Sequence, residues 1–375
     1  MNTITNTNTP ALPNLVPNRS LLSRSMPRGV LTHLTTMEDL RDTLARQRKA
    51  MEERDHDRSL SQLHVEFRGG RLTAQWLDRR KGLSEEMAVH KNAYSQMASD
   101  LLPARGGNFL TTQARLGEDG AKLSTASWAT FARQQQNPRM FRTVKYRRDD
   151  GKVERMIRSM HSTGYAAYSN AEFVADALDA APELGAMTVL DVSQRDTEIR
   201  IRLSATPREE FTLDKPVQML TLWNSEVGRR STGITAGAWK LICTNGMGSW
   251  DSKTGWTWRH YGNVERIRDG VRSAIEEAQT SASGVVEAYG KALTTEIDDM
   301  LSFLDTEMGR EGLTGTQKDR AILALTDETT TQGDWLASAI DAITLAAQDE
   351  GDLLAQHDME RAASRILIRG LRTPA

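Results

Sequence analysis

An α+β fold is predicted for this chain, with an antiparallel, β-hairpin-rich core, flanking helices and a helical C-terminal region. Three observations predict it. Alternating apolar and polar runs come in pairs separated by turn residues, stretches with helical spacing follow N-cap residues, and the residues after 263 are amphipathic and acidic. Residues 1–30 are rich in Asn, Thr, Pro and Ser and are predicted to form a disordered tail. A basic α+β core over 31–263 and an acidic helical region over 264–375 follow.

Three hairpins are predicted in the core. The paired runs are 63–67 with 71–77 across Gly69–Gly70, 141–147 with 153–157 across Asp150–Gly151, and 187–192 with 197–203. In the third hairpin Ile199, Ile201 and Leu203 share one face. Arg200 and Arg202 share the opposite face. Further strands are predicted over 217–223 and 236–243.

Helices are predicted from apolar residues at helical spacing and from cap residues. Thr36 and Asn170 are predicted as N-caps, and Pro103 and Pro138 as stops. The expected helices cover 36–53, 84–101, 124–136, 172–178, 264–289, 291–308, 334–348 and 353–367.

Composition excludes several classes of protein. The 375 residues contain no run of about 18 apolar residues, so no transmembrane helix and no membrane partner are expected. The N-terminus lacks the apolar stretch of a secretory signal, and Cys243 is the only cysteine, which excludes a disulfide framework and a cysteine-rich zinc module. No metal-ligand spacing and no Walker-type phosphate loop occur, so no metal and no cofactor are predicted. The basic segment Gly228–Gly233 could hold a phosphate or could equally form a turn. A cytoplasmic location is expected.

The charge of the chain is unevenly distributed. The formal net charge is −2, but residues 274–375 hold eight basic and 19 acidic residues, net −11. Residues 1–273 hold 40 basic and 31 acidic residues, net +9. A basic body indicates an anionic partner. The alternative is that the two oppositely charged parts attract each other or that each solvates its own surface.

The strongest basic signal lies on the predicted strands. Arginine holds phosphate oxygens bidentately, and several such contacts would dominate the affinity for a nucleic acid. The candidate phosphate-binding residues are Arg142, Lys145, Arg147, Arg148, Arg155, Arg158, Arg200 and Arg202. The alternative is a solvated sheet face in which arginine stems cover apolar neighbours.

An aromatic and basic group follows near residue 256. Trp256, Trp258 and Tyr261 are candidates for stacking on bases, with Arg259 beside them. Trp256 and Trp258 have the spacing of one strand face, so the competing interpretation is packing in the core.

Nucleophilic catalysis is an alternative function. Cys243 would be the nucleophile, His260 its base and Asn245 or Asn263 the residue that orients the base. The apolar residues 238–242 before the cysteine favour a buried, inert thiol instead.

Short motifs in a fixed order resemble a known family. They cover 87–98 with Pro103 after it, 157–165 with 168–170, 223–228, 241–247, 259–264, 334–336 and 343–344. Over about residues 85–345 the chain resembles the phage/plasmid-like protein family that carries domain of unknown function 932. The residues that match are Tyr165, Asn170, Asn224, Asn245, Gly246, His260 and Gly262. The chain departs from the family where it has Thr163–Gly164 in place of a frequent aspartate–arginine pair, and Tyr261 in place of a frequent threonine.

The resemblance implies a gene of a phage, prophage or plasmid in a bacterial host cytosol, among genes of DNA metabolism. The order of hairpins and helices is also compatible with a single-strand annealing protein of the Rad52-like kind, which is an analogy at the level of fold. The leading hypothesis is a non-enzymatic protein that binds nucleic acid, single-stranded DNA above all, and promotes annealing in recombination. The acidic helices would support a homo-oligomer or recruit a basic partner. The alternatives are a Cys/His-dependent hydrolase or transferase, and an inhibitor that binds a host factor through its acidic helices.

Overall fold

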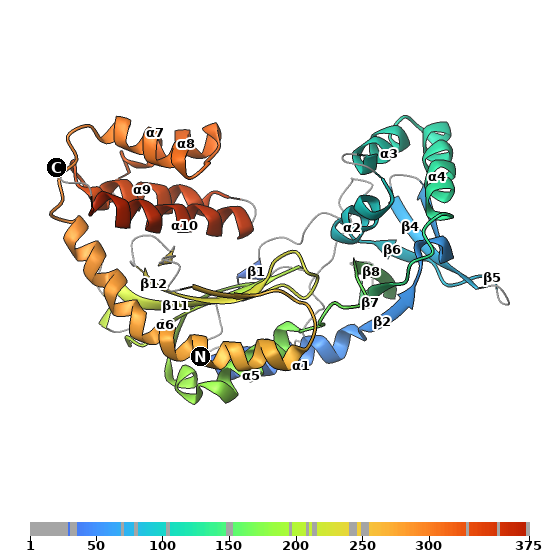
Figure 1. Cartoon of the computed structure of the whole chain (residues 1–375), viewed down its shortest axis with the longest axis horizontal. Coiled ribbons are helices and arrows are strands. Elements are labelled where there is room, and N and C mark those ends of the chain that lie inside the picture. The colour runs from blue at the N-terminus through green and yellow to red at the C-terminus, as the bar shows by residue number, and fades with distance from the viewer. Residues whose placement is uncertain are drawn as a thin grey trace, which may run out of the picture.

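The computed structural model of the chain combines helices with largely antiparallel strands and ends in a helical C-terminal region, so the predicted fold class is confirmed (Figure 1). It describes residues 29–30, 36–68, 71–78, 82–102, 106–147, 153–194, 197–207, 210–211, 216–239, 246–248, 255–327, 330–350 and 353–372. None of the helices in these ranges is long and apolar enough to cross a membrane. The predicted tail lies almost entirely outside the described residues.

Sheet I forms the half of the molecule on the right of Figure 1. Its strands, in spatial order, are β2 (Arg54–Arg58), β7 (Arg139–Arg147), β8 (Val153–His161), β6 (Met87–Val89), β4 (Arg71–Asp78) and β3 (Leu63–Arg68), with β5 (Gly82–Leu83) paired to β4. Helices α2 (Lys91–Leu101), α3 (Gly106–Ala114) and α4 (Glu118–Ala132) lie on one face. Phe141, Ile157 and Trp128 are among the buried side chains between these helices and the sheet.

Sheet II forms the other half. Its strands, in spatial order, are β1 (Gly29–Val30), β9 (Thr188–Gln194), β10 (Ile199–Ser204), β11 (Val217–Asn224), β12 (Thr232–Trp239) and β13 (Gly246–Gly248), with β14 (Gly255–Trp258) paired to β12. Helices α1 (Met37–Met51), α5 (Asn170–Ala180) and α6 (Val264–Ala292) run beneath it in Figure 1. Ile199, Ile201 and Leu203 point toward these helices, as the alternation of the third hairpin predicts.

The C-terminal helices are built onto the far end of α6. They are α7 (Met300–Arg310), α8 (Gly315–Ala324), α9 (Leu336–Gln348) and α10 (Leu353–Gly370). Ile267 and Val271 of α6 belong to the core of sheet II, whereas Val285 and Tyr289 belong to the core of the C-terminal helices. The acidic helical region therefore begins with a helix that is shared by two cores. In Figure 1, α9 and α10 lie on the side of sheet II opposite to α5 and α6.

The three predicted hairpins are present. β3 pairs with β4, β7 with β8 and β9 with β10, all antiparallel. The predicted turn of the second hairpin, Asp150–Gly151, lies outside the described residues. Each hairpin is local in sequence, and its alternation of apolar and polar residues is enough to predict its pairing.

Other elements differ from the predictions. The predicted helix 84–101 is divided, because Met87 and Val89 face the core as a strand, β6, which runs parallel to β8 before α2 begins. Ser169, not Asn170, is the N-cap of α5, in a capping box with Glu172. The helix predicted over 291–308 is divided between the end of α6 and α7, and the strand predicted over 236–243 begins earlier, as β12. The helices α3 and α8 were not predicted.

Two glycines of α6 provide a test of how closely this helix packs on sheet II. A Cβ at Gly270 would lie 2.2 Å from Nε1 of Trp258, a rigid ring, whereas a Cβ at Gly284 would meet nothing within 4 Å. We expect Gly270→Ala to lower the free energy of unfolding by about 1–3 kcal/mol through overpacking. Gly284→Ala should raise it by about 0.5–1 kcal/mol, because alanine is the better helix former. Urea denaturation of both variants measures this, and changes of the same sign would contradict the packing described.

Candidate functional site

Four of the eight residues predicted to bind phosphate are buried. Arg142, Arg158, Arg200 and Arg202 have exposed fractions between 0 and 4%. The interpretation of these side chains as a solvent-facing basic face is wrong, because each of them contacts carboxylates of the same chain. They belong to two separate clusters, one between the two sheets and one beneath α10.

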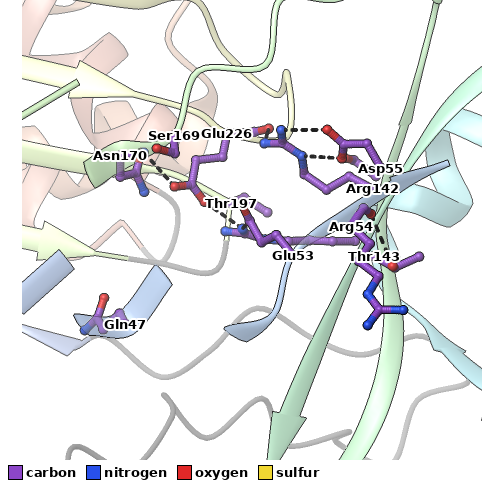
Figure 2. Close-up of polar contacts among 12 residues, drawn as sticks. Gln47, Glu53, Arg54, Asp55, Arg142, Thr143, Ser169, Asn170, Thr197 and Glu226 are labelled. Carbon is purple, nitrogen blue, oxygen red and sulfur yellow. Dashed lines mark hydrogen bonds and ion pairs between the residues drawn. The ribbon is translucent and has the colours of Figure 1, made fainter. Parts of the chain in front are cut away.

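The first cluster, the junction network, consists of Glu53, Asp55, Arg142, Arg158 and Glu226. Figure 2 labels all of these residues except Arg158. Arg142 donates from Nε and Nη2 to the Asp55 carboxylate at 3.1 and 3.3 Å, and from Nη1 to the Glu226 carbonyl at 3.1 Å. Arg158 Nη1 donates to Glu53 at 3.1 Å and to the Glu226 carboxylate at 2.6 Å. Since the arginines belong to sheet I and Glu226 to the loop between β11 and β12, the network joins the two sheets.

Charges within the junction network are compensated. Burial acts to raise the pKa of Glu226, but Arg158 and the backbone N–H of Asn170 more than offset this and hold the carboxyl pKa below its usual value. The pKa of Glu53 is raised, because the side chain is buried and faces the charge of Glu226. Two guanidinium groups therefore meet three carboxyl groups, and no positive charge remains there for a phosphate.

The second cluster, the α10 cluster, consists of Asp191, Arg200, Arg202 and Glu360. Arg200 Nη2 donates to Asp191 at 3.3 Å, and its Nη1 lies 3.6 Å from Glu360 Oε1. Arg202 donates from Nη2 to the same Glu360 oxygen, and its Nη1 lies 3.8 Å from Asp191. Glu360 belongs to the acidic region and the arginines to the basic body. At this contact the two oppositely charged parts of the chain attract each other.

The other candidate cations are distributed over sheet I. Lys145 Nζ lies 2.5 Å from the Glu52 carboxylate. Arg155 is half-buried and donates from Nη1 to Thr143 Oγ1 at 3.3 Å. The side chain of Arg147 and the whole of Arg148 lie outside the described residues.

Trp256 and Trp258 pack against α6. Trp256 Nε1 donates to Glu277 of α6 at 3.1 Å, and the indole of Trp258 occupies the space above Gly270. Both side chains are half-buried and contact the core of sheet II. Packing against the core, the competing interpretation of these tryptophans, is therefore what the structure contains.

Three rings form a stack beside the junction network. The ring centroids of His161 and Tyr165 are 3.7 Å apart at an interplanar angle of 6°, and those of Tyr165 and His260 are 5.3 Å apart at 15°. The Tyr165 hydroxyl donates to the Glu226 carbonyl at 3.1 Å. The stack therefore brings together the end of β8, the loop after it and the segment that precedes α6.

Asparagine side chains extend the hydrogen bonds of the junction network and the ring stack into sheet II. Asn224 Nδ2 donates to Asn170 Oδ1 at 2.9 Å, and the backbone N–H of Asn170 donates to Glu226 Oε1 at 2.6 Å. Thr232 Oγ1 donates to Asn224 at 2.6 Å and lies 3.0 Å from His260 Nε2. Tyr165, Asn170, Asn224 and His260, all named from the resemblance, thus meet in one place.

The remaining motif residues are less informative. Gly262 has a positive φ of 82°, and its N–H donates to the Gly164 carbonyl at 3.0 Å. The backbone of Gly246 pairs with Trp239 at the edge of sheet II. Asn245 lies outside the described residues.

The histidines of the stack are neutral near pH 7. Burial, followed by the charge of Arg142, lowers the pKa of His161 to about 3, and burial lowers the pKa of His260 to about 4. His260 is also engaged at both ring nitrogens, by Thr232 and by the Ala166 carbonyl at 3.3 Å. These properties suit a packing group better than a general base near neutral pH. Cys243, the predicted nucleophile for which His260 would be the base, lies outside the described residues.

Tyr261 is the exposed member of the predicted aromatic group. Its side chain is 72% exposed, and a Cβ at residue 164 would lie 3.0 Å from its ring, so the ring lies directly on Gly164. A β-bridge between Tyr165 and Tyr261 fixes the backbone at this point. Arg259, two residues earlier, is exposed. We call Gly164, Arg259 and Tyr261 the Tyr261 platform.

The acidic helices direct many of their charges inward. Glu307 and Glu311 are paired with Arg365 and Arg369 of α10. Fewer carboxylates are thus left for mimicry of a nucleic acid than the count of 19 suggests. Within the described ranges no group of three or more His, Cys, Asp or Glu side chains has an arrangement that would hold a metal ion.

The chain was compared with protein-family models, with curated proteins and with solved structures, and no match was found in any of the three comparisons. The resemblance to the phage/plasmid-like family therefore remains an expectation from short motifs. The chain departs from that family at Thr163–Gly164 and at Tyr261, and of these residues Gly164 and Tyr261 contact each other.

Sequence reasoning missed the acidic half of both clusters and one ring of the stack. Glu226 and His161 lie inside motifs that the resemblance singled out, which is a signal that could have found them. Asp55 and Glu360 carry no such signal, because their partners are distant in sequence and ordinary charged residues surround them.

Removal of the central carboxylate tests the junction network. Glu226→Gln leaves Arg158 and Arg142 buried beside a neutral amide, so we expect the free energy of unfolding to fall by about 3–5 kcal/mol. Glu265→Gln, which removes an exposed partner of Arg268, is the matched control and should cost less than about 1 kcal/mol. Chemical denaturation measures both. Equal costs would mean that the network does not join the sheets.

The depressed histidine pKa values predict a pH dependence. Unfolded histidine has a pKa of about 6.5, so between that pH and about 4 the unfolded chain binds protons that the folded chain does not. Stability is therefore lost as the pH falls through this window. His161→Phe keeps a ring on Tyr165 and should make the slope shallower, by at most about 1.4 kcal/mol per pH unit.

Tyr165→Phe is the control for this pH dependence. It keeps both histidines, so it should lower stability at every pH and leave the slope as in the wild type. Denaturation curves from pH 4 to 7 give the comparison. If His161→Phe leaves the slope unchanged, His161 is not buried in its neutral form.

Proposed function

We propose that the protein binds single-stranded nucleic acid, with the Tyr261 platform as the place where a base stacks. The observation that carries the proposal is the ring of Tyr261, which is 72% exposed and backed by Gly164. One face of the ring is supported by backbone, and the other is open to a base. An aromatic ring held in this way loses little conformational freedom when a base stacks on it.

Positive groups flank the platform. Arg259 is exposed, and within the described residues its side chain has no carboxylate partner. The N-terminus of α6 begins at Val264, three residues after Tyr261, and its first N–H groups carry partial positive charge. The basic balance of residues 1–273 adds a longer-range attraction for a polyanion. A base on Tyr261 with its phosphate near Arg259 satisfies the chemistry of single-strand binding.

A chemical role for the same region is less favoured. The stacked histidines are neutral, buried and hydrogen-bonded, and the hydroxyl that contacts His260, that of Thr232, is itself fully buried and donates to Asn224. The platform instead presents a flat ring and a cation, which are groups for binding.

Substitutions at the platform test the proposal. Loss of one base stack costs about 1–3 kcal/mol, so Tyr261→Ala should weaken the binding of a fluorescent oligothymidine by about 5-fold to 150-fold. Tyr261→Phe keeps the ring and should bind within about twofold of the wild type. Arg259→Ala should reduce the slope of log affinity against log salt by about 0.7. Fluorescence anisotropy across a salt series gives both quantities.

Arg133→Ala, at an exposed position directly after α4, is the control for loss of one positive charge. It should leave the oligothymidine affinity close to that of the wild type. The proposal fails if the wild type does not bind at low salt, or if Tyr261→Ala binds as well as Tyr261→Phe.

A further inference from the structure

The second face of sheet II has the composition of a face that meets water or a polar ligand. Arg200 and Arg202 of β10, Asp191 of β9, and Thr221 and Trp223 of β11 lie opposite the side that faces α5 and α6. An antiparallel sheet commonly has one apolar and one solvated face. Here the polar face is buried as well, and every residue of β10 is buried. We call this face, which carries Asp191, Arg200, Arg202, Thr221 and Trp223, the polar face of sheet II.

Helix α10 covers the polar face through polar side chains. His357, Glu360 and Ser364 have the spacing of one helical face and are 2–3% exposed. Glu360 contacts both arginines, and the rings of His357 and Trp223 are 5.0 Å apart. The apolar side of α10, which includes Met359 and Ile366, belongs to the core of the C-terminal helices. The helix is therefore held to its own bundle by apolar packing and to the sheet largely by charges and hydrogen bonds.

Hydrogen bonding at this contact is incomplete. Arg200 is 3% exposed, and among the residues that the structure describes its Nε and Nη1 find no hydrogen-bond acceptor; Nη1 lies 3.6 Å from Oε1 of Glu360. A buried charged group with unmade hydrogen bonds is unfavourable. Burial, followed by the charge of Arg202, also lowers the pKa of Arg200. Arg200 is thus a buried cation with donors that the present contacts leave unused.

We propose that the polar face of sheet II is a second phosphate-binding surface, and that α10 is its cover, with Glu360 in the place of a phosphate. Phosphate oxygens accept bidentate hydrogen bonds from arginine, and a phosphodiester would use the Arg200 donors that Glu360 does not reach. Trp223 lies beside the arginines on the same face, with the Arg230 guanidinium 4.6 Å from its ring centroid and the His357 ring 5.0 Å away, so this face holds a third cation. The ligand is the backbone of a single-stranded nucleic acid, so the inference rests on the proposed function for the class of ligand but not on the Tyr261 platform.

Removal of the Glu360 charge tests the cover. Glu360→Gln weakens the hold of α10 on the arginines, and binding of oligothymidine should become tighter by about 5-fold to 150-fold, the usual range for coupled equilibria. Two additional phosphate contacts should steepen the salt slope by about 1.4. Arg200→Ala with Arg202→Ala should remove the gain in the Glu360→Gln background.

Glu311→Gln is the matched control. It makes the same change of net charge and removes a partner of Arg365 and Arg369 on α10, but it does not touch sheet II. It should produce no gain that depends on Arg200 and Arg202. If Glu311→Gln and Glu360→Gln raise the affinity equally, the effect is one of net charge and the inference is overturned.

A second measurement uses the wild-type chain and holds even if Glu360→Gln does not fold. Saturating oligothymidine should speed amide hydrogen exchange in α10, because the helix is displaced, and unchanged exchange would overturn the inference. The Tyr261→Ala variant separates the two proposals. If it binds normally while Glu360→Gln shows its gain, only the Tyr261 platform fails. If it binds weakly and Glu360→Gln shows no gain, only the second surface fails.

Discussion

The arrangement of the molecule depends on one buried carboxylate, that of Glu226. It receives the Arg158 guanidinium and the Asn170 N–H, while its backbone carbonyl receives Arg142 and the Tyr165 hydroxyl. These donors come from sheet I, from the loop after β8 and from the start of α5, whereas Glu226 lies between β11 and β12 of sheet II. A buried ion pair adds little net stability compared with apolar packing. A buried charge that loses its partner nevertheless lowers the stability strongly, so the two partners must be positioned accurately. The network therefore fixes how the two sheets meet more than it stabilises either sheet.

This constraint decides which groups remain for a ligand. The arginines that would make the strongest phosphate sites in an isolated hairpin serve the junction network or the α10 cluster. The stack of His161, Tyr165 and His260 is built on the junction network and holds the segment 259–262 against residues 164–166. Tyr261, with its exposed ring, belongs to this segment. The groups that position it are buried or half-buried and are fixed by their own contacts.

Local features of the fold could be predicted from sequence, and the partners of the charged residues could not. Hairpins such as 63–77 follow from alternation over neighbouring residues. Arg202 lies on the face of β10 that the alternation predicts, but its partner Glu360 is 158 residues away, and a strand pattern does not distinguish a face that meets solvent from one that meets a polar helix. The sequence pattern does not separate β6 from the helix that follows it, since the three residues of this strand are too few to establish a period.

The contacts of the α10 cluster give a structural reason for the uneven charge of the chain. A basic body of net +9 and an acidic end of net −11 leave the whole chain at −2, and the α10 cluster is a place where the two parts neutralise each other. A polyanion that approaches the polar face of sheet II must compete with a carboxylate that is already present at high effective concentration. Salt weakens the attraction to the polyanion and, to a lesser degree, the buried intramolecular pair, because screening is weaker inside the protein. Binding to that face would use two arginines where the Tyr261 platform uses Arg259 alone, so it would depend on salt more steeply, and the weakening of the intramolecular pair offsets only part of this difference.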